Sequence, residues 1–218
     1  MDSAIRTIAL SLLVTSFLAV ESRSLRRAVL AYMAQALLMV AVIACFATLH
    51  PRLWVWVATA LVTKFGLISW MLHREARAGD DREVAPWVGA WVSAALIGAL
   101  ALAAYALVHT HAWAFAPTPL AGREPYRTNV AVALTLLVVG LYAVLTRRDG
   151  LKVVIGVCLI ENGAHLSLVS LAPGMHDTVL IGVVTDVVVA VYLLLHLVRG
   201  VARQLGSRDT SVLRELRW

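Results

Sequence analysis

Long apolar segments separated by short polar connections run through the chain of 218 residues. A helix needs about 20 apolar residues to cross the roughly 30 Å hydrocarbon core of a bilayer. Segments of this length are predicted at residues 3–20, 28–49, 53–72, 87–109, 128–146, 151–172 and 178–199. The pattern therefore predicts an all-α integral membrane protein with seven transmembrane helices.

The positions of proline and tryptophan support these boundaries. The six prolines all lie between predicted spans or directly before one, where they do not interrupt the interior of a helix. Trp54, Trp70 and Trp87 lie at span ends, as indole side chains do at the membrane–water interface. The first span carries one basic residue and no Ala-x-Ala site, so we expect it to be a retained helix and not a cleaved signal peptide.

Composition excludes a soluble enzyme. The chain is 61% hydrophobic and 15% charged, whereas soluble domains are about 45–50% apolar and about 25% charged. It contains no GxGxxG, CxxC or HExxH motif, and its two cysteines, Cys45 and Cys158, lie inside apolar segments. We therefore expect no catalytic residues, no cofactor and no metal site in this chain.

The distribution of charge predicts the orientation. The net charge is +6, but the basic residues lie in short connections between spans, which favours a lipid bilayer and not nucleic acid as their partner. Fourteen of them lie in the connections after the first, third and fifth spans and in the C-terminal tail, and four lie on the opposite side. The positive-inside rule then places the C-terminus in the cytoplasm and the N-terminus outside.

The longest predicted connection, about residues 110–127, divides the chain. Residues 1–127 are predicted to hold four N-terminal helices and this connection, and residues 128–205 a bundle of three helices. Residues 206–218 form a polar, basic segment that we expect to be a cytoplasmic tail.

Three charged residues are predicted near the middle of the membrane. They are Lys64 in the third span, Glu161 in the sixth and Asp186 in the seventh. Each such charge costs about 2.5–3.5 kcal/mol on insertion scales, and such residues pair with one another and often mark ion pathways. His165 follows Glu161 by one helical turn, so the two share a helix face. His196 lies ten residues beyond Asp186, about 15 Å along a helix and toward the cytoplasm.

Other interpretations of these residues stay open. Lys64 with one acid can be a structural ion pair, His165 can serve only as a hydrogen-bond partner of Glu161, and Gln35 fits an interhelical hydrogen bond. The protein can also be a free-standing ion-coupled secondary transporter or a structural membrane scaffold. A retinal protein is excluded because the last span has no lysine for a Schiff base. A haem b protein is excluded because His165 and His196 differ in depth.

Several segments resemble a known family. Residues 151–171, LKVVIGVCLIENGAHLSLVSL, resemble the helix of the K subunit (NuoK) of respiratory complex I that carries a buried glutamate, and residues 179–201 resemble its next helix. The overall plan resembles hydrogenase-4 component E, in which three K-like helices follow additional N-terminal helices. Residues 59–72, TALVTKFGLISWML, also resemble that family.

The resemblance implies a non-catalytic subunit of a complex I-like assembly of the group 4 [NiFe]-hydrogenase type. It implies antiporter-like membrane subunits and other hydrogenase subunits as partners, in the cell membrane, with redox chemistry on those other chains. It also implies that Glu161 and Asp186 hold the places of the two family acids. Together with Lys64, His165 and His196 they would form a path for protons or sodium ions.

Overall fold

The computed structural model describes residues 2–115, 118–120, 122–172, 177–205 and 208–210. Within these ranges the chain is helical and has no strand. The elements are α1 (Asp2–Glu21), α2 (Leu25–Ala47), α3 (Leu53–Ala60), η1 (Leu61–Ile68), α4 (Ser69–Arg77), α5 (Ala90–Phe115), α6 (Tyr126–Thr146), α7 (Gly150–Leu171) and α8 (Asp177–Leu205). Seven helical segments of this described part are long and apolar enough to span a membrane, because α3, η1 and α4 form one continuous segment. The seven predicted helices are confirmed.

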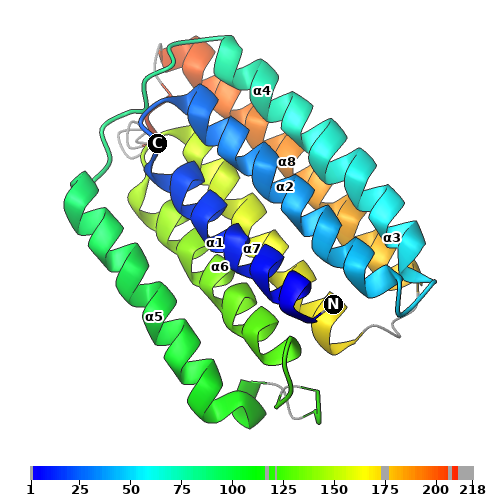
Figure 1. The fold of residues 1–218 in the computed structure, drawn as a ribbon. Helices are drawn as coiled ribbons and strands as arrows, with labels where there is room; N and C mark the ends of the chain where they lie inside the picture. The colour runs from blue at the N-terminus through cyan, green and yellow to red at the C-terminus, as the bar shows by residue number, and fades with distance from the viewer. Residues whose placement is uncertain (1, 116–117, 121, 173–176, 206–207, 211–218) are drawn as a thin grey trace.

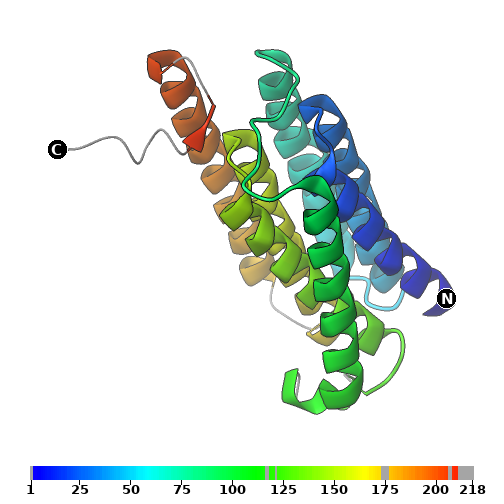
Figure 2. The same ribbon diagram turned by 90° about the vertical axis from the view of Figure 1, so that its left-hand side faces the viewer.

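The helices run side by side along one direction (Figure 1). α7 lies at the centre, packed against α6, α2, α1 and α8, while α5 packs mainly against α6 and α1 at the edge of the bundle. Figure 2 shows α5 in front of the other helices. The two larger buried apolar clusters combine N-terminal spans with α6 and α7: one includes residues of all four N-terminal spans, and the other includes residues of the first three. The division at residue 127 stays a prediction, although the two parts share one core.

Two helices differ from the predicted spans in detail. α5 continues to Phe115, with a non-helical backbone at His111, where the hydropathy pattern predicts an end near residue 109. α8 continues to Leu205, and residues 208–210 return to pair with the start of α7, through hydrogen bonds such as Gly150 N to Arg208 O at 3.1 Å. Except for residues 208–210, the predicted tail lies outside the described residues.

The third span contains a π-helical segment that the hydropathy pattern does not predict. In η1 the helical turn is wider than in an α-helix: the Ser69 N–H donates to the Lys64 carbonyl, five residues earlier. The Ser69 hydroxyl donates to the same carbonyl at 2.9 Å. π-Helical turns are rare and frequently occur at functional sites. This π-helical segment therefore contains Lys64, the one lysine of the span.

α6 and α7 approach closely because glycines face the neighbouring backbone. A Cβ atom on Gly140 would lie 2.6 Å from the Gly156 carbonyl oxygen, and one on Gly163 would lie 2.6 Å from the Ala133 carbonyl oxygen. Small residues at such positions let membrane helices pack backbone to backbone. This contact fixes the rotation of α7 and thus the direction in which its polar residues point.

We expect Gly140→Ala to destabilise the protein by about 1–3 kcal/mol, because the new methyl group overpacks the helix contact. Thermal unfolding of the purified protein in detergent measures the change. Gly98→Ala is the control, because a Cβ atom at Gly98 on α5 meets nothing within 4 Å. That control should be neutral or slightly stabilising, and an equal loss in both variants would contradict the role of the contact.

Candidate functional site

A buried ion pair joins the third and sixth spans near their middles. Lys64 Nζ donates to Glu161 Oε2 at 2.7 Å and to Asn162 Oδ1 at 2.7 Å. The side chains of Lys64 and Glu161 are only 1% and 8% exposed. The wide turn of η1 carries the lysine, and the close packing of α6 on α7 orients the glutamate. The structure therefore decides which of the two predicted acids meets Lys64.

His165 extends this polar cluster by one turn of α7. Its Nδ1 lies in close contact with Glu161 Oε1, as the four-residue spacing predicts. The Trp56 ring from α3 lies edge-on to the imidazole, with 5.2 Å between ring centroids. His165 Nε2, Trp56 Nε1 and Asn162 Nδ2 are buried and have no hydrogen-bond partner among the described residues. The cluster thus retains hydrogen-bonding capacity beyond the ion pair.

Asp186 and His196 form no hydrogen bond or ion pair with the described residues of this cluster. Both are exposed on α8, whose span from Thr185 to Gln204 is only 11% buried. Asp186 makes no ion pair with any described residue, and the His196 ring stacks near Tyr192 of its own helix. The structure therefore brings together Lys64, Glu161 and His165, and leaves the other two predicted site residues on the outer surface of α8.

Two further expectations concern smaller features. Gln35 of α2 donates from Nε2 to Ser16 Oγ of α1 at 2.9 Å, which matches its interpretation as an interhelical hydrogen bond. In the described part of the chain, no group of three or more His, Cys, Asp or Glu side chains is placed to hold a metal ion.

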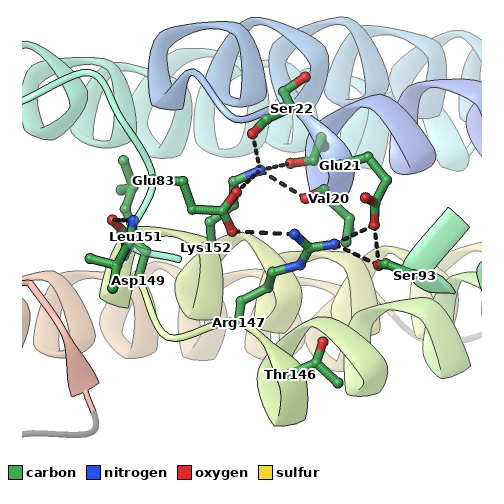
Figure 3. Close-up of polar contacts among 12 residues, drawn as sticks. Val20, Glu21, Ser22, Glu83, Ser93, Thr146, Arg147, Asp149, Leu151 and Lys152 are labelled. Atoms are coloured by element: carbon green, nitrogen blue, oxygen red, sulfur yellow. Dashed lines mark hydrogen bonds and ion pairs between the residues drawn. The ribbon is translucent and has the colours of Figure 1, made fainter. Parts of the chain in front are cut away.

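A second buried charge network lies at one end of the bundle (Figure 3). Arg147, at the end of α6, pairs with Glu21 of α1 and with Glu83 of the connection after α4, and it donates to Ser93 of α5 at 2.8 Å. Its side chain is 3% exposed. From the hydropathy pattern, Arg147 is predicted only to lie in the polar connection after the fifth span. The network is therefore a feature that the sequence does not predict.

Lys152 completes this network from the first turn of α7. Its Nζ donates to the backbone carbonyls of Ala19, Val20 and Ser22 at 2.7–2.9 Å, which stabilises the end of α1, where carbonyl groups lack helical partners. Glu83 Oε2 lies 3.9 Å from Lys152 Nζ. Burial raises the pKa of the Glu83 carboxyl, although the neighbouring Lys152 and Arg147 lower it. The network ties α1, α6, α7 and the connection after α4 together.

Comparison with known proteins gives the family. The chain is 30% identical to hydrogenase-4 component E of Escherichia coli strain K12 over 210 residues, which cover 94% of each protein. The chain belongs to the hydrogenase-4 component E family. It is also 28% identical to the uncharacterised Mycobacterium tuberculosis protein Rv0085 over 155 residues, which cover 69% of this chain and 66% of that protein. No solved structure matches the chain.

A second family covers only the C-terminal part of this hydrogenase-4 component E homologue. Residues 129–218 match the family described as NADH-ubiquinone/plastoquinone oxidoreductase chain 4L, which confirms the resemblance to the K subunit. Glu161 and His165 lie inside that match, whereas Lys64 lies outside it. The buried ion pair thus joins the K-like part to the additional N-terminal helices.

Proposed function

We propose that this chain is a non-catalytic membrane subunit of a complex I-like hydrogenase assembly in the cell membrane. In this role it contributes a buried charged cluster to the movement of protons or sodium ions. The family supports the assembly, because its Escherichia coli member is named as a hydrogenase-4 component. The observation that carries the role in translocation is the Lys64–Glu161 pair at mid-membrane, with Nζ and Oε2 2.7 Å apart. Redox chemistry on other subunits would supply the driving energy.

The cluster has the groups that a proton relay needs. Glu161 contacts an ammonium group on one side and an imidazole on the other. A carboxylate takes up a proton more readily when a neighbouring cation moves away, and it releases the proton when the cation returns. Histidine is the side chain best suited to pass that proton on near neutral pH. A small displacement of Lys64 on η1 would therefore switch the protonation of Glu161.

The exposed side of α8 supports contact with a partner subunit. Asp186 lies within the last membrane span and is exposed. Because a carboxylate facing hydrocarbon is costly, exposed intramembrane acids normally face protein or water. We place an antiporter-like subunit on this side of α8, where Asp186 and His196 would continue the path from the buried cluster. The excess of basic residues in the connections at the end of the bundle near Arg147 supports our proposal that this end faces the cytoplasm and that the N-terminus lies outside.

The decisive experiment substitutes Glu161→Gln in the native complex. We expect assembly to be retained, because glutamine keeps an oxygen that can accept the hydrogen bond from Lys64 Nζ. Ion translocation per redox turnover should fall by about tenfold or more, since positioned proton-transfer groups contribute at least that much. Acidification of inverted membrane vesicles, measured with a pH-sensitive dye during hydrogenase turnover, gives the rate.

The control is Asp2→Asn, which removes an exposed carboxylate at the start of α1. It should leave both assembly and translocation unchanged. Normal translocation in the Glu161→Gln complex would exclude the proton-relay role and leave the pair as a structural contact. Purification of the native chain without hydrogenase subunits would instead favour a free-standing transporter.

A further inference from the structure

A large polar cavity opens at the end of the bundle, between the ends of α4 and α8 and the connection that follows α4. Its volume is about 740 Å³. Nine of its lining residues are charged, and five of these are arginines: Arg74, Arg82, Arg199, Arg203 and Arg208. The acids that line it are Glu75, Asp80, Glu83 and Asp149. The cavity is separate from the Lys64–Glu161 cluster and plays no part in the proposed translocation.

Most of the acidic groups in this cavity are already engaged inside the protein. Glu75 pairs with Arg199, and Glu83 pairs with Arg147 at 3.4 Å. Asp149 accepts hydrogen bonds from the backbone N–H groups of Leu151 and Val84. Of the lining acids, only Asp80 and Asp149, whose carboxylate interacts with Arg208, therefore remain to offset the other four arginines.

Four arginines remain available to an anionic ligand. Arg74, Arg82 and Arg203 are exposed and form no ion pair with any described residue; the Arg74 guanidinium lies over the Trp70 ring, 5.6 Å from its centroid. Arg208 donates only weakly, to the carbonyl oxygens of Asp80 at 3.4 Å and Glu75 at 3.3 Å. Guanidinium groups are the preferred donors for phosphate because they present parallel N–H groups to its oxygens. The free charge of the cavity thus suits a phosphate group.

An apolar cavity adjoins the polar one at Arg208. It has a volume of about 160 Å³ and lies between α7 and α8, lined by Val153, Val154, Leu194, Leu197, Val198 and Val201 with Gly150, Arg208 and Thr210. Arg208 lines both cavities, because residues 208–210 fold back onto the start of α7. A cationic cavity joined to an apolar groove at the end of a membrane span matches a ligand with an anionic head and an acyl chain.

We propose that these two cavities form a binding site for an anionic phospholipid. The headgroup phosphate would bind Arg74, Arg82, Arg203 and Arg208, and one acyl chain would enter the groove between α7 and α8. Basic cavities between membrane helices on the cytoplasmic side bind anionic lipid headgroups in this way. The bound lipid would link α4 and residues 208–210 to α8, which is the least buried of the spans.

The test is native mass spectrometry of the purified full chain in detergent, titrated with phosphatidylglycerol, with phosphatidylcholine or with inorganic phosphate. We expect one tightly bound phosphatidylglycerol, and binding of phosphatidylcholine that is at least about tenfold weaker. The double variant Arg82→Gln/Arg203→Gln should weaken phosphatidylglycerol binding by about tenfold or more. The double variant Arg27→Gln/Arg77→Gln is the matched control, because both arginines are exposed and neither lines the cavity.

A second pair of variants tests the apolar groove. Val201→Trp should fill the groove and weaken phosphatidylglycerol binding, whereas Val189→Trp, at an exposed position of α8 outside the groove, should not. Several outcomes would overturn the proposal: equal binding of the two lipids, equal loss in the control arginine variant, or saturation of the site by inorganic phosphate alone. Burial of Arg82 and Arg203 under a partner chain in the intact complex, with no lipid retained, would reassign the cavity to a protein contact.

Discussion

The substitution Lys64→Met is expected to lower the free energy of unfolding by about 3–5 kcal/mol, because it leaves the Glu161 carboxylate buried without its cation. Glu161 is 8% exposed and its Oε2 lies 2.7 Å from Lys64 Nζ. Equilibrium unfolding in mixed micelles measures the loss. Arg52→Met is the control, because Arg52 is exposed at the start of α3 and forms no ion pair with the described residues. That control should change stability by less than about 0.5 kcal/mol.

The double variant Lys64→Met/Glu161→Leu identifies the cause of this loss. Removal of both charges leaves no unpaired ion, and replacing a buried pair by apolar residues is often nearly neutral. We therefore expect the double variant to be more stable than Lys64→Met alone, with a coupling energy well above about 0.5 kcal/mol. Additive losses would show that the two side chains do not interact in the folded protein.

Substitution of Arg147 is expected to have a comparable effect at the end of the bundle. Arg147→Met leaves the carboxylates of Glu21 and Glu83 without their guanidinium partner and removes the bond to Ser93. A loss of about 3–5 kcal/mol is expected for a broken buried pair. Thermal unfolding in detergent, followed by tryptophan fluorescence, measures it.

Two further variants separate charge from geometry in this network. Arg147→Lys keeps the charge but not the planar guanidinium group that reaches several partners. Its stability should therefore lie between that of the wild type and that of Arg147→Met. Arg77→Met removes an exposed arginine at the end of α4 and should leave stability within about 0.5 kcal/mol. A normal unfolding temperature for Arg147→Met would mean that the network does not hold this end of the bundle together.

The polar residues of the central site could be recognised in the sequence because the membrane makes them exceptional. A charged side chain in the middle of an apolar segment has a large insertion cost, which singled out Lys64, Glu161 and Asp186. Helical periodicity then linked His165 to Glu161. The sequence could not show whether Glu161 or Asp186 is the partner of Lys64, because both acids are predicted at similar depth.

The network around Arg147 and Lys152 could not be predicted for a related reason. Both residues lie beside polar connections, where basic side chains are ordinarily exposed to water. Their burial depends on Glu21, Glu83 and Ser93, which are 54–126 residues away from Arg147 in sequence. No local pattern reports contacts of that separation.

The amino-acid sequence alone determined the seven spans, their class and the presence of charge in the membrane, since segment length and the cost of burying an ion are local properties. The tertiary structure decided the partners of those charges. Helix rotation, set by contacts such as Gly140 on Gly156, turned Glu161 toward Lys64, whereas Asp186 lies on the exposed side of α8. Such rotation depends on packing between distant segments, so the hydropathy pattern does not predict it.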